Sequence, residues 1–290
     1  MSLKQEEEAE VFIVQNETSR LKSVLKNIAS LVTNKEQKEK SDHNIDKKLL
    51  RPPPIFMTLI TSFQISIFIF YLIRYEYKLT EDKDELKTFT GGCVTSFLTY
   101  HPKFRFQLWR HITASFLHSG NYHLFKNMMA QVLIGIPQEI AYRIHKIAPL
   151  YFGGVGFSII MMNAIQPNSL FGCGASGGDY ALIFAQISNL MLNWREIPRR
   201  KTQAALIFLH IFSDFGEDIY LFLKYGKTKY AHGVHFNSAI FGLIYGFFIL
   251  HYKETTRLKR YVRTIILASY FLFVIIAIVK YFTPKEYFHL

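Results

Sequence analysis

The chain alternates long apolar stretches with short polar segments, and seven of the apolar stretches are long enough to form membrane-spanning helices. About 20 predominantly apolar residues cross the hydrocarbon core of a bilayer as a helix. Polar residues interrupt three of the stretches, and such groups need protein or water neighbours inside a membrane. We therefore predict an all-α, polytopic membrane helix bundle. Its spans are expected at 54–73, 120–141, 147–165, 173–194, 203–223, 232–251 and 263–282.

Two segments lie outside these spans. Residues 1–52 form a charged N-terminal tail, in which apolar spacing over 18–33 predicts an amphipathic helix, with the tail solvated or lying on the membrane. Residues 75–111 form a long loop whose aromatic side chains favour packing at the membrane interface. We divide the chain accordingly into a tail, 1–52, and a transmembrane domain, 53–290.

Basic residues in the short loops predict the orientation of the bundle. The cluster "DKKLLR" precedes the first span, while "YRIHK", "WREIPRRK" and "HYKETTRLKRYVR" follow the second, fourth and sixth. Lys and Arg concentrate in cytoplasmic loops. All four clusters fall on one side if the N-terminus is cytoplasmic, which predicts an integral, multi-pass membrane protein with its C-terminus outside.

Composition supports a membrane protein. Half of the residues are hydrophobic, with 27 Phe and 17 Tyr, and the net charge is +12. The basic clusters lie between apolar segments, which fits anionic lipid headgroups better than nucleic acid. We see no metal-ligand spacing such as CxxC, and we expect neither a metal nor a cofactor. Cys93 and Cys173 can both face outside and pair, but we favour two unpaired thiols.

The predicted topology brings four polar residues to one depth. Spans two, four and six all enter from the outer face. His123 and Asn127 lie near the start of span two, whereas Ser176 and His235 lie in the first turns of spans four and six. Serine becomes a good nucleophile when a base, usually histidine, takes its proton. Because His123, Asn127 and the Ser176 backbone N–H can donate to an oxyanion, the pattern predicts acyl-transfer chemistry.

Glycines would bring the serine and the histidine together. Gly177 and Gly178 follow Ser176, while Gly242 and Gly246 form a small-xxx-small stripe in span six. Small residues let helix backbones approach closely in membranes. We therefore expect spans four and six to pack through these glycines.

Several separated motifs, covering about 98–250, resemble those of the rhomboid intramembrane serine proteases. The segment "LWRHITASFLHSGNYHLFKNM" resembles the family's Trp-Arg loop and its His-x4-His-x3-Asn pattern, which maps Trp109, Arg110 and His118 as well. "GIPQE" resembles its Gly-x-x-x-Glu, and "GASGGDYAL" contains its Gly-x-Ser-Gly motif with a tyrosine four residues after the serine. "SDFGEDIY" resembles the fifth helix of animal secretase-type members, and "VHFNSAIFGLIYG" the His-x-x-Gly-x-x-x-Gly helix.

The resemblance implies a rhomboid-like six-helix core with a seventh helix at the C-terminus. It implies a catalytic dyad, in which Ser176 attacks a peptide bond and His235 is the general base. It also implies residues that bind the oxyanion or support the base, the tyrosine by stacking on the histidine ring. These are His123, Asn127, Tyr180 and Gly174.

The resemblance further implies substrates and a location. The substrates would be single-span membrane proteins, growth-factor precursors among them, cut near the outer or lumenal end of the spanning helix. The protein would lie in the lipid bilayer of the secretory pathway, in the Golgi, endosome or plasma membrane, and nucleic acid is not an expected partner.

Two positions depart from the family pattern. Asp179 stands where the family has an apolar residue, and Ser238 replaces the first glycine of the sixth-helix pair. We expect Asp179 to meet water or a polar helix neighbour rather than to be a third catalytic residue, and we expect the small Ser238 to be tolerated. These departures leave open a second function: a catalytically silent rhomboid-like protein that binds membrane clients and controls their trafficking. A transporter is less favoured, because no inverted repeat is visible.

Overall fold

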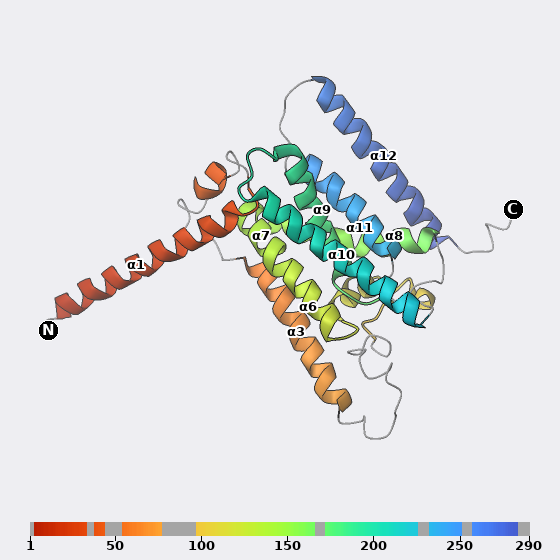
Figure 1. The fold of residues 1–290 in the computed structure, drawn as a ribbon, viewed down its shortest axis with the longest axis horizontal. Helices are drawn as coiled ribbons and strands as arrows, with labels where there is room; N and C mark the ends of the chain where they lie inside the picture. The colour runs from red at the N-terminus through yellow and green to blue at the C-terminus, as the bar shows by residue number, and fades with distance from the viewer. Residues whose placement is uncertain are drawn as a thin grey trace.

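The computed structural model shows an α-helical bundle from which one long N-terminal helix projects (Figure 1). It describes residues 3–33, 38–43, 54–76, 97–165, 172–225, 232–250 and 257–283. Within these residues the extended pairing is a single antiparallel bridge between Tyr100 and Gly172. The predicted all-α membrane bundle with a seventh C-terminal helix is therefore confirmed.

Each predicted span corresponds to helix. Pro137 explains the π-helical turn in the second span, because proline lacks an N–H and its ring crowds the carbonyl of the preceding turn.

Three helices, around Ile55–Ile73, Ile144–Ala164 and Arg260–Phe282, are long and apolar enough by themselves to cross a membrane, among the residues described. In chain order the spans are α3 (Ile55–Glu76); α6 (Asn121–Ala130) with η3 (Gln131–Gly135) and α7 (Ile136–Tyr142); α8 (Ile144–Ile165); α9 (Ser176–Asn193); α10 (Arg200–Tyr225); α11 (His232–Tyr245) with η4 (Gly246–Leu250); and α12 (Arg257–Phe282).

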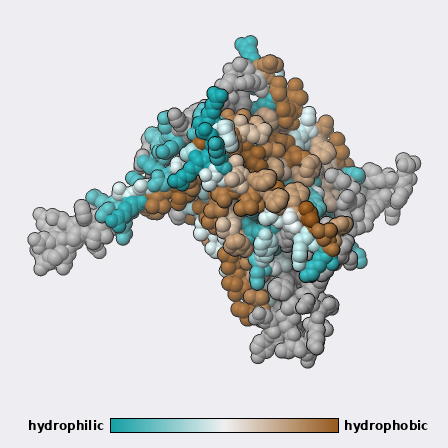
Figure 2. Space-filling view, viewed as in Figure 1, coloured by the Kyte–Doolittle hydropathy of each residue, from teal (hydrophilic) through white to brown (hydrophobic). Residues whose placement is uncertain are grey.

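Large apolar side chains cover the outside of the bundle, as the brown surface in Figure 2 shows. A soluble protein rarely exposes so large an apolar area, whereas a membrane protein presents it to lipid. The exposed residues include Leu59, Phe63 and Phe70 of α3, Phe208, Phe212 and Phe215 of α10, and Phe271, Ile275 and Ile276 of α12.

The centre of the bundle is the packing of α8, α9 and α11. Leu150 and Tyr151 of α8 and Ala181 and Leu182 of α9 are fully buried in the main apolar core. The core includes Ala175, next to the serine that begins α9, so buried packing supports that position.

The glycines of span six pack as predicted, against α9. A Cβ on Gly242 would lie 2.3 Å from the Ala181 carbonyl oxygen, and one on Gly246 would lie 2.8 Å from the Ala185 Cα. Only glycine fits so close to a neighbouring backbone. These two glycines therefore set the close approach of α11 to α9.

The glycines of span four do not pack as predicted. A Cβ on Gly177 would meet Val155 and Ser158, and one on Gly178 would meet the Tyr151 ring; all three neighbours belong to α8. Successive helix residues point about 100° apart, so α9 turns these two glycines toward α8, while its backbone at Ala181 and Ala185 lies against α11.

The seventh helix, α12, is attached at two levels. Val274 and Ala277 pack against Met161 and Ala164 of α8. Near the end of α12, the Tyr281 hydroxyl lies 2.8 Å from His111 Nε2 and 3.1 Å from the Tyr100 hydroxyl, and donates to the Arg105 carbonyl at 3.0 Å. The polar contacts tie α12 to the loop that precedes α6.

The described part of the loop before α6, residues 97–120, contains three short helices, η1 (Pro102–Phe104), α5 (Trp109–Thr113) and η2 (Ala114–Phe116). Arg110 organises the loop: its guanidinium donates to the Thr99 carbonyl at 2.9 Å and to Gln107 Oε1 at 2.5 Å. Burial lowers the pKa of His111 from its ordinary value, while a hydrogen bond with the Leu108 carbonyl opposes this change.

The N-terminal helix α1 (Leu3–Ser30) meets the bundle at its C-terminal end, through its last turn and the residues that follow it (Figure 1). Ala29, Val32 and Thr33 are buried. The Val32 carbonyl accepts hydrogen bonds from Asn189 Nδ2 at 2.5 Å and from the Tyr142 hydroxyl at 3.4 Å. We did not expect this docking of the end of the tail, and the amphipathic helix predicted at 18–33 is the C-terminal part of a longer one.

Candidate active site

Ser176 is the first residue of α9, and the segment before it is held by the loop that precedes α6. Tyr100 and Gly172 exchange two backbone hydrogen bonds, at 3.1 and 3.2 Å, and the Gly174 N–H donates to the Ala114 carbonyl at 2.9 Å. The first N–H groups of a helix have no intrahelical acceptor, and the helix dipole there favours negative charge. Ser176 therefore stands where a developing oxyanion would be stabilised.

Cys173 adds a covalent restraint to the same segment. It is disulfide-bonded, and the sequence has one other cysteine, Cys93, which lies outside the described residues. Our preference for two unpaired thiols was therefore wrong. The spacing of two distant cysteines carried no geometric information, so the sequence allowed the pair without favouring it.

The structure brings together the serine and the histidine that the sequence singled out. His235 Nε2, on α11, lies 2.8 Å from Ser176 Oγ, and Ser176 is half-buried. The Tyr180 ring, one turn below Ser176, stacks on the His235 ring with centroids 4.3 Å apart and planes 14° apart. The contact is within the hydrogen-bond range that a general base needs to take the serine proton.

Gly174 and His123 are neighbours. Gly174 has φ +123°, and a Cβ there would lie 2.7 Å from His123 Cε1. Both observations require glycine at this position. His123 Nδ1 lies 3.0 Å from Ser119 Oγ, which leaves the other side of the ring directed toward the Gly174 backbone.

Asn127 supplies a buried donor without a partner. Its side chain is 3% exposed, and its Nδ2 makes no hydrogen bond within the described residues. Both ring nitrogens of the fully buried His118, which contacts the His123 ring edge-on, are also unpartnered there. Buried polar groups without partners are rare and call for an explanation, such as a group that arrives with a substrate.

Asp179 and Ser238, the two departures from the family pattern, do not touch the Ser176–His235 contact. Asp179 is fully buried beside Tyr151, and the polar side chain that faces it is Gln131 of η3. Ser238 donates to the Gly154 carbonyl of α8 at 3.0 Å. Ser238 therefore joins α11 to α8 through its hydroxyl, a role that glycine could not take.

An ion pair beside the site was missed by the sequence analysis. Lys126 of α6 donates through Nζ to Asp214 Oδ1 of α10, and both side chains are buried. Asp214 Oδ2 accepts a hydrogen bond from the Tyr180 hydroxyl at 2.8 Å. The signal was present in the sequence, because span two contains a lysine and span five an aspartate. Charged residues inside membrane spans are rare, and opposite charges there usually pair.

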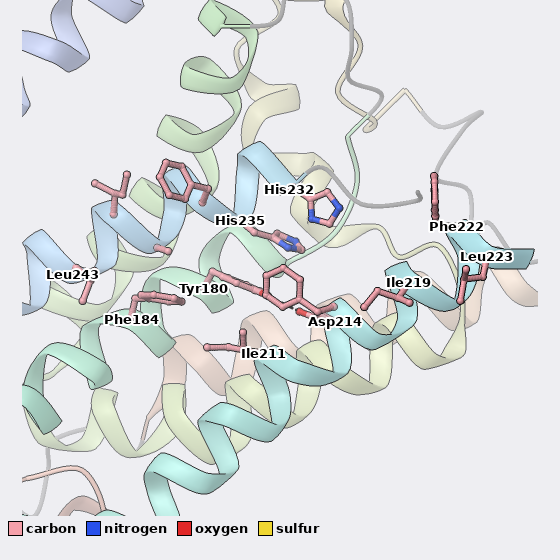
Figure 3. Close-up of a pocket in the computed structure, with 14 residues that line it drawn as sticks. Tyr180, Phe184, Ile211, Asp214, Ile219, Phe222, Leu223, His232, His235 and Leu243 are labelled. Carbon is pink, nitrogen blue, oxygen red and sulfur yellow. Dashed lines mark hydrogen bonds between the residues drawn. The ribbon is translucent and has the colours of Figure 1, made fainter. Parts of the chain in front are cut away.

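A largely apolar pocket of about 630 Å³ opens beside the histidine, between α9, α10 and α11 (Figure 3). His235, Tyr180 and Asp214 line it together with His232. The remaining lining residues are apolar, among them Phe184, Ile211, Phe215, Ile219, Phe222 and Leu243. The pocket has the size and the lining to hold an apolar group.

Comparison with known proteins agrees with these features. The Rhomboid domain family matches residues 105–253. Rhomboid-related protein 1 of Caenorhabditis elegans is 34% identical over 277 residues, which cover 93% of this chain and 76% of that protein. Rhomboid-related protein 2 of Mus musculus is 30% identical over 213 residues, covering 72% and 68%. Inactive rhomboid-related protein 2 of C. elegans is 25% identical over 240 residues, covering 82% and 66%.

Proposed function

Because the chain belongs to the rhomboid family, we propose that it is a serine-type endopeptidase that cleaves the spanning segments of single-span membrane proteins. The observation that carries this proposal is the 2.8 Å contact between Ser176 Oγ and His235 Nε2, with Tyr180 stacked on the histidine. In this mechanism His235 takes the proton of Ser176 as the hydroxyl attacks the peptide carbonyl. The protonated ring then gives that proton to the leaving amine.

The surrounding donors suit the tetrahedral intermediate. The Ser176 N–H at the start of α9 and the unpartnered Asn127 amide would donate to the oxyanion, with His123 beside them. Each such donor contributes roughly 2.7–4 kcal/mol to lowering the barrier. The apolar pocket beside His235 would accept an apolar part of a lipid-embedded substrate.

The disulfide at Cys173 supports the proposed orientation. Disulfides persist in oxidising compartments, such as the lumen of the secretory pathway and the cell surface. The Ser176 end of the bundle would then face the outer or lumenal side, with the N-terminus in the cytoplasm and cleavage near the outer leaflet.

Labelling with a fluorophosphonate probe tests the proposal directly, because the probe reacts only with an activated serine. We expect the full chain to be labelled, Ser176→Ala to lose the label, and His235→Ala to react roughly 10²–10⁴ times more slowly, the usual contribution of a general base. Ser66→Ala is the matched control, because its hydroxyl bonds only the Ser62 carbonyl on the exposed side of α3. Labelling that survives in Ser176→Ala would contradict the proposal.

A second candidate function is a silent protein that binds membrane clients and controls their trafficking. The buried carboxyl of Asp179, three residues after Ser176, favours it, as does the similarity to a relative named inactive. The same experiment separates the two functions: a folded wild-type chain that takes no label would favour the silent protein.

A further inference from the structure

The carboxylate of Asp214 joins two partners on different helices. One oxygen accepts from Lys126 Nζ of α6, and the other accepts from the Tyr180 hydroxyl of α9 at 2.8 Å. The side chain of Lys126 is 7% exposed and that of Asp214 11%. Taking two charges out of water is costly, and such a pair persists where its geometry is good and the remaining lone pairs are satisfied. The hydrogen bond from Tyr180 satisfies the second carboxylate oxygen.

Contacts continue from this pair to the nucleophile. The Tyr180 ring, anchored at its hydroxyl by Asp214, lies 4.3 Å from the His235 ring, which in turn lies 2.8 Å from Ser176 Oγ. Four helices therefore meet in one line of contacts, α6, α10, α9 and α11. Asp214 itself touches no reacting atom.

The pocket beside these rings explains why an anchor is needed. Tyr180 and His235 both line the space of about 630 Å³, and of the other lining residues Phe184 stacks on the Tyr180 ring with centroids 6.0 Å apart (Figure 3). The first half of α10 packs on α9 through Ala204, Ile207 and Ile211, whereas beyond Asp214 the helix borders the pocket. A ring at the edge of a pocket has fewer neighbours than one in a close-packed interior, so the hydrogen bond from its hydroxyl to Asp214 adds a restraint on Tyr180 to the two ring contacts.

We propose that the Lys126–Asp214 pair positions the Tyr180 ring. Through that ring, the pair keeps His235 within hydrogen-bond distance of Ser176. Asp214 is the positioning residue, and Lys126 neutralises its charge inside the membrane. This inference rests on the proposed function, because it concerns the orientation of the general base.

Two double variants separate the anchor from the charge. Lys126→Met/Asp214→Asn removes both charges but leaves an amide oxygen that accepts from Tyr180. Lys126→Met/Asp214→Leu removes both charges and the acceptor as well. Because both variants are neutral at these positions, a difference between them reports the Tyr180 anchor and not the buried charge.

The readout is the reaction with a fluorophosphonate probe, resolved into the maximal labelling rate, kinact, and the probe concentration for half of it, KI. We expect kinact of the Asn double variant to stay within about threefold of wild type. We expect that of the Leu double variant to fall about tenfold, the order of one net hydrogen bond, at unchanged KI. Tyr180→Phe keeps the ring and removes the hydroxyl, so by itself it should lower kinact about as much as the Leu double variant does. Added to the Leu double variant, Tyr180→Phe should lower kinact no further.

Lys126→Met alone should lower kinact more than the Asn double variant does, because it leaves the buried Asp214 charged and without its lysine partner. Lys224→Met is the matched control, since Lys224 bonds Tyr220 on the exposed part of α10, and should label like wild type. Melting temperatures of all variants show that each is folded. Equal kinact in the two double variants, with a wild type that labels at Ser176, would overturn this inference alone; a wild type that does not label would overturn the proposed function as well.

Discussion

The residue type at position 174 is determined by the backbone conformation and by the space that the neighbouring side chain leaves. Gly174 combines a positive φ with a histidine ring where a Cβ would stand. The glycine of the Gly-x-Ser-Gly motif is thus explained by backbone conformation and by the approach of His123, and not by flexibility. The motif is a geometric requirement on the segment that leads into α9.

Gly174→Ala tests this requirement. The substitution forces a side chain into a sparsely populated backbone conformation, at a cost of about 1–3 kcal/mol, and into the space of His123. We expect fluorophosphonate labelling to slow by up to roughly 10²-fold, the order of losing one oxyanion donor. The measurement is the labelling rate together with the melting temperature.

Gly216→Ala provides the matched control. A Cβ on Gly216 of α10 would meet nothing within 4 Å, and an alanine stabilises a helix interior by about 0.5–1 kcal/mol. This variant should label like wild type and melt no lower. If both alanine variants labelled alike, the explanation of Gly174 would be wrong.

The limits of sequence analysis also show at this scale. Ser176 and His235 could be brought together from sequence, because the topology fixed their depth and the motif spacing fixed their helix turns. The pairing of Lys126 with Asp214 could not be placed as securely, since depth alone does not say which faces of α6 and α10 meet. The disulfide at Cys173 likewise depends on a loop path that hydropathy does not encode.

The N-terminal end of α3 is joined to α7 by a side chain that caps it. Glu139 of α7 accepts hydrogen bonds from the N–H groups of Phe56 at 3.0 Å and Met57 at 2.7 Å, at the start of α3. A carboxylate at a helix N-terminus satisfies orphan donors and complements the dipole. The Gly-x-x-x-Glu motif therefore attaches the first span to the second.

Glu139→Ala should detach this end of α3. It leaves two N–H groups without a partner, one of them on the fully buried Met57, at about 1–3 kcal/mol for each buried group. We expect a lower melting temperature in detergent micelles. Glu139→Gln keeps one acceptor oxygen and should lose less, so a glutamine variant that melts as low as the alanine variant would contradict the capping role.

Helix positions were predictable from hydropathy, but helix faces were only partly so. The small-residue stripe of α11 correctly indicated close approach to α9, since Gly242 and Gly246 admit the backbone there. Gly177 and Gly178 were assigned to the same contact and instead admit α8. A glycine in the sequence predicts that another helix approaches closely, but it does not predict which helix, because several helices surround each position in a bundle.

At the scale of the whole molecule, the tail joins three spans at the end of the bundle remote from Ser176. The Leu31 and Val32 carbonyls, just after α1, accept hydrogen bonds from Gln203 of α10, Asn189 of α9 and Tyr142 of α7. Backbone carbonyls that leave a helix end need such partners when they are buried. The tail thus contributes to holding α10, which packs mainly on α9.

Asn189→Leu tests this docking while roughly preserving side-chain volume. The variant leaves the Val32 carbonyl short of its closest donor, at about 1–3 kcal/mol, which shifts the ratio of docked to undocked tail roughly 5- to 150-fold. We expect trypsin to cut at Lys22 and Lys26 correspondingly faster in detergent, while the melting temperature of the bundle changes little. Ser30→Ala, which removes only an exposed local hydrogen bond to Asn27, should cut like wild type. Equal cleavage of Asn189→Leu and wild type would mean that the tail is held by its apolar contacts, Ala29 and Val32, and not by the carbonyls.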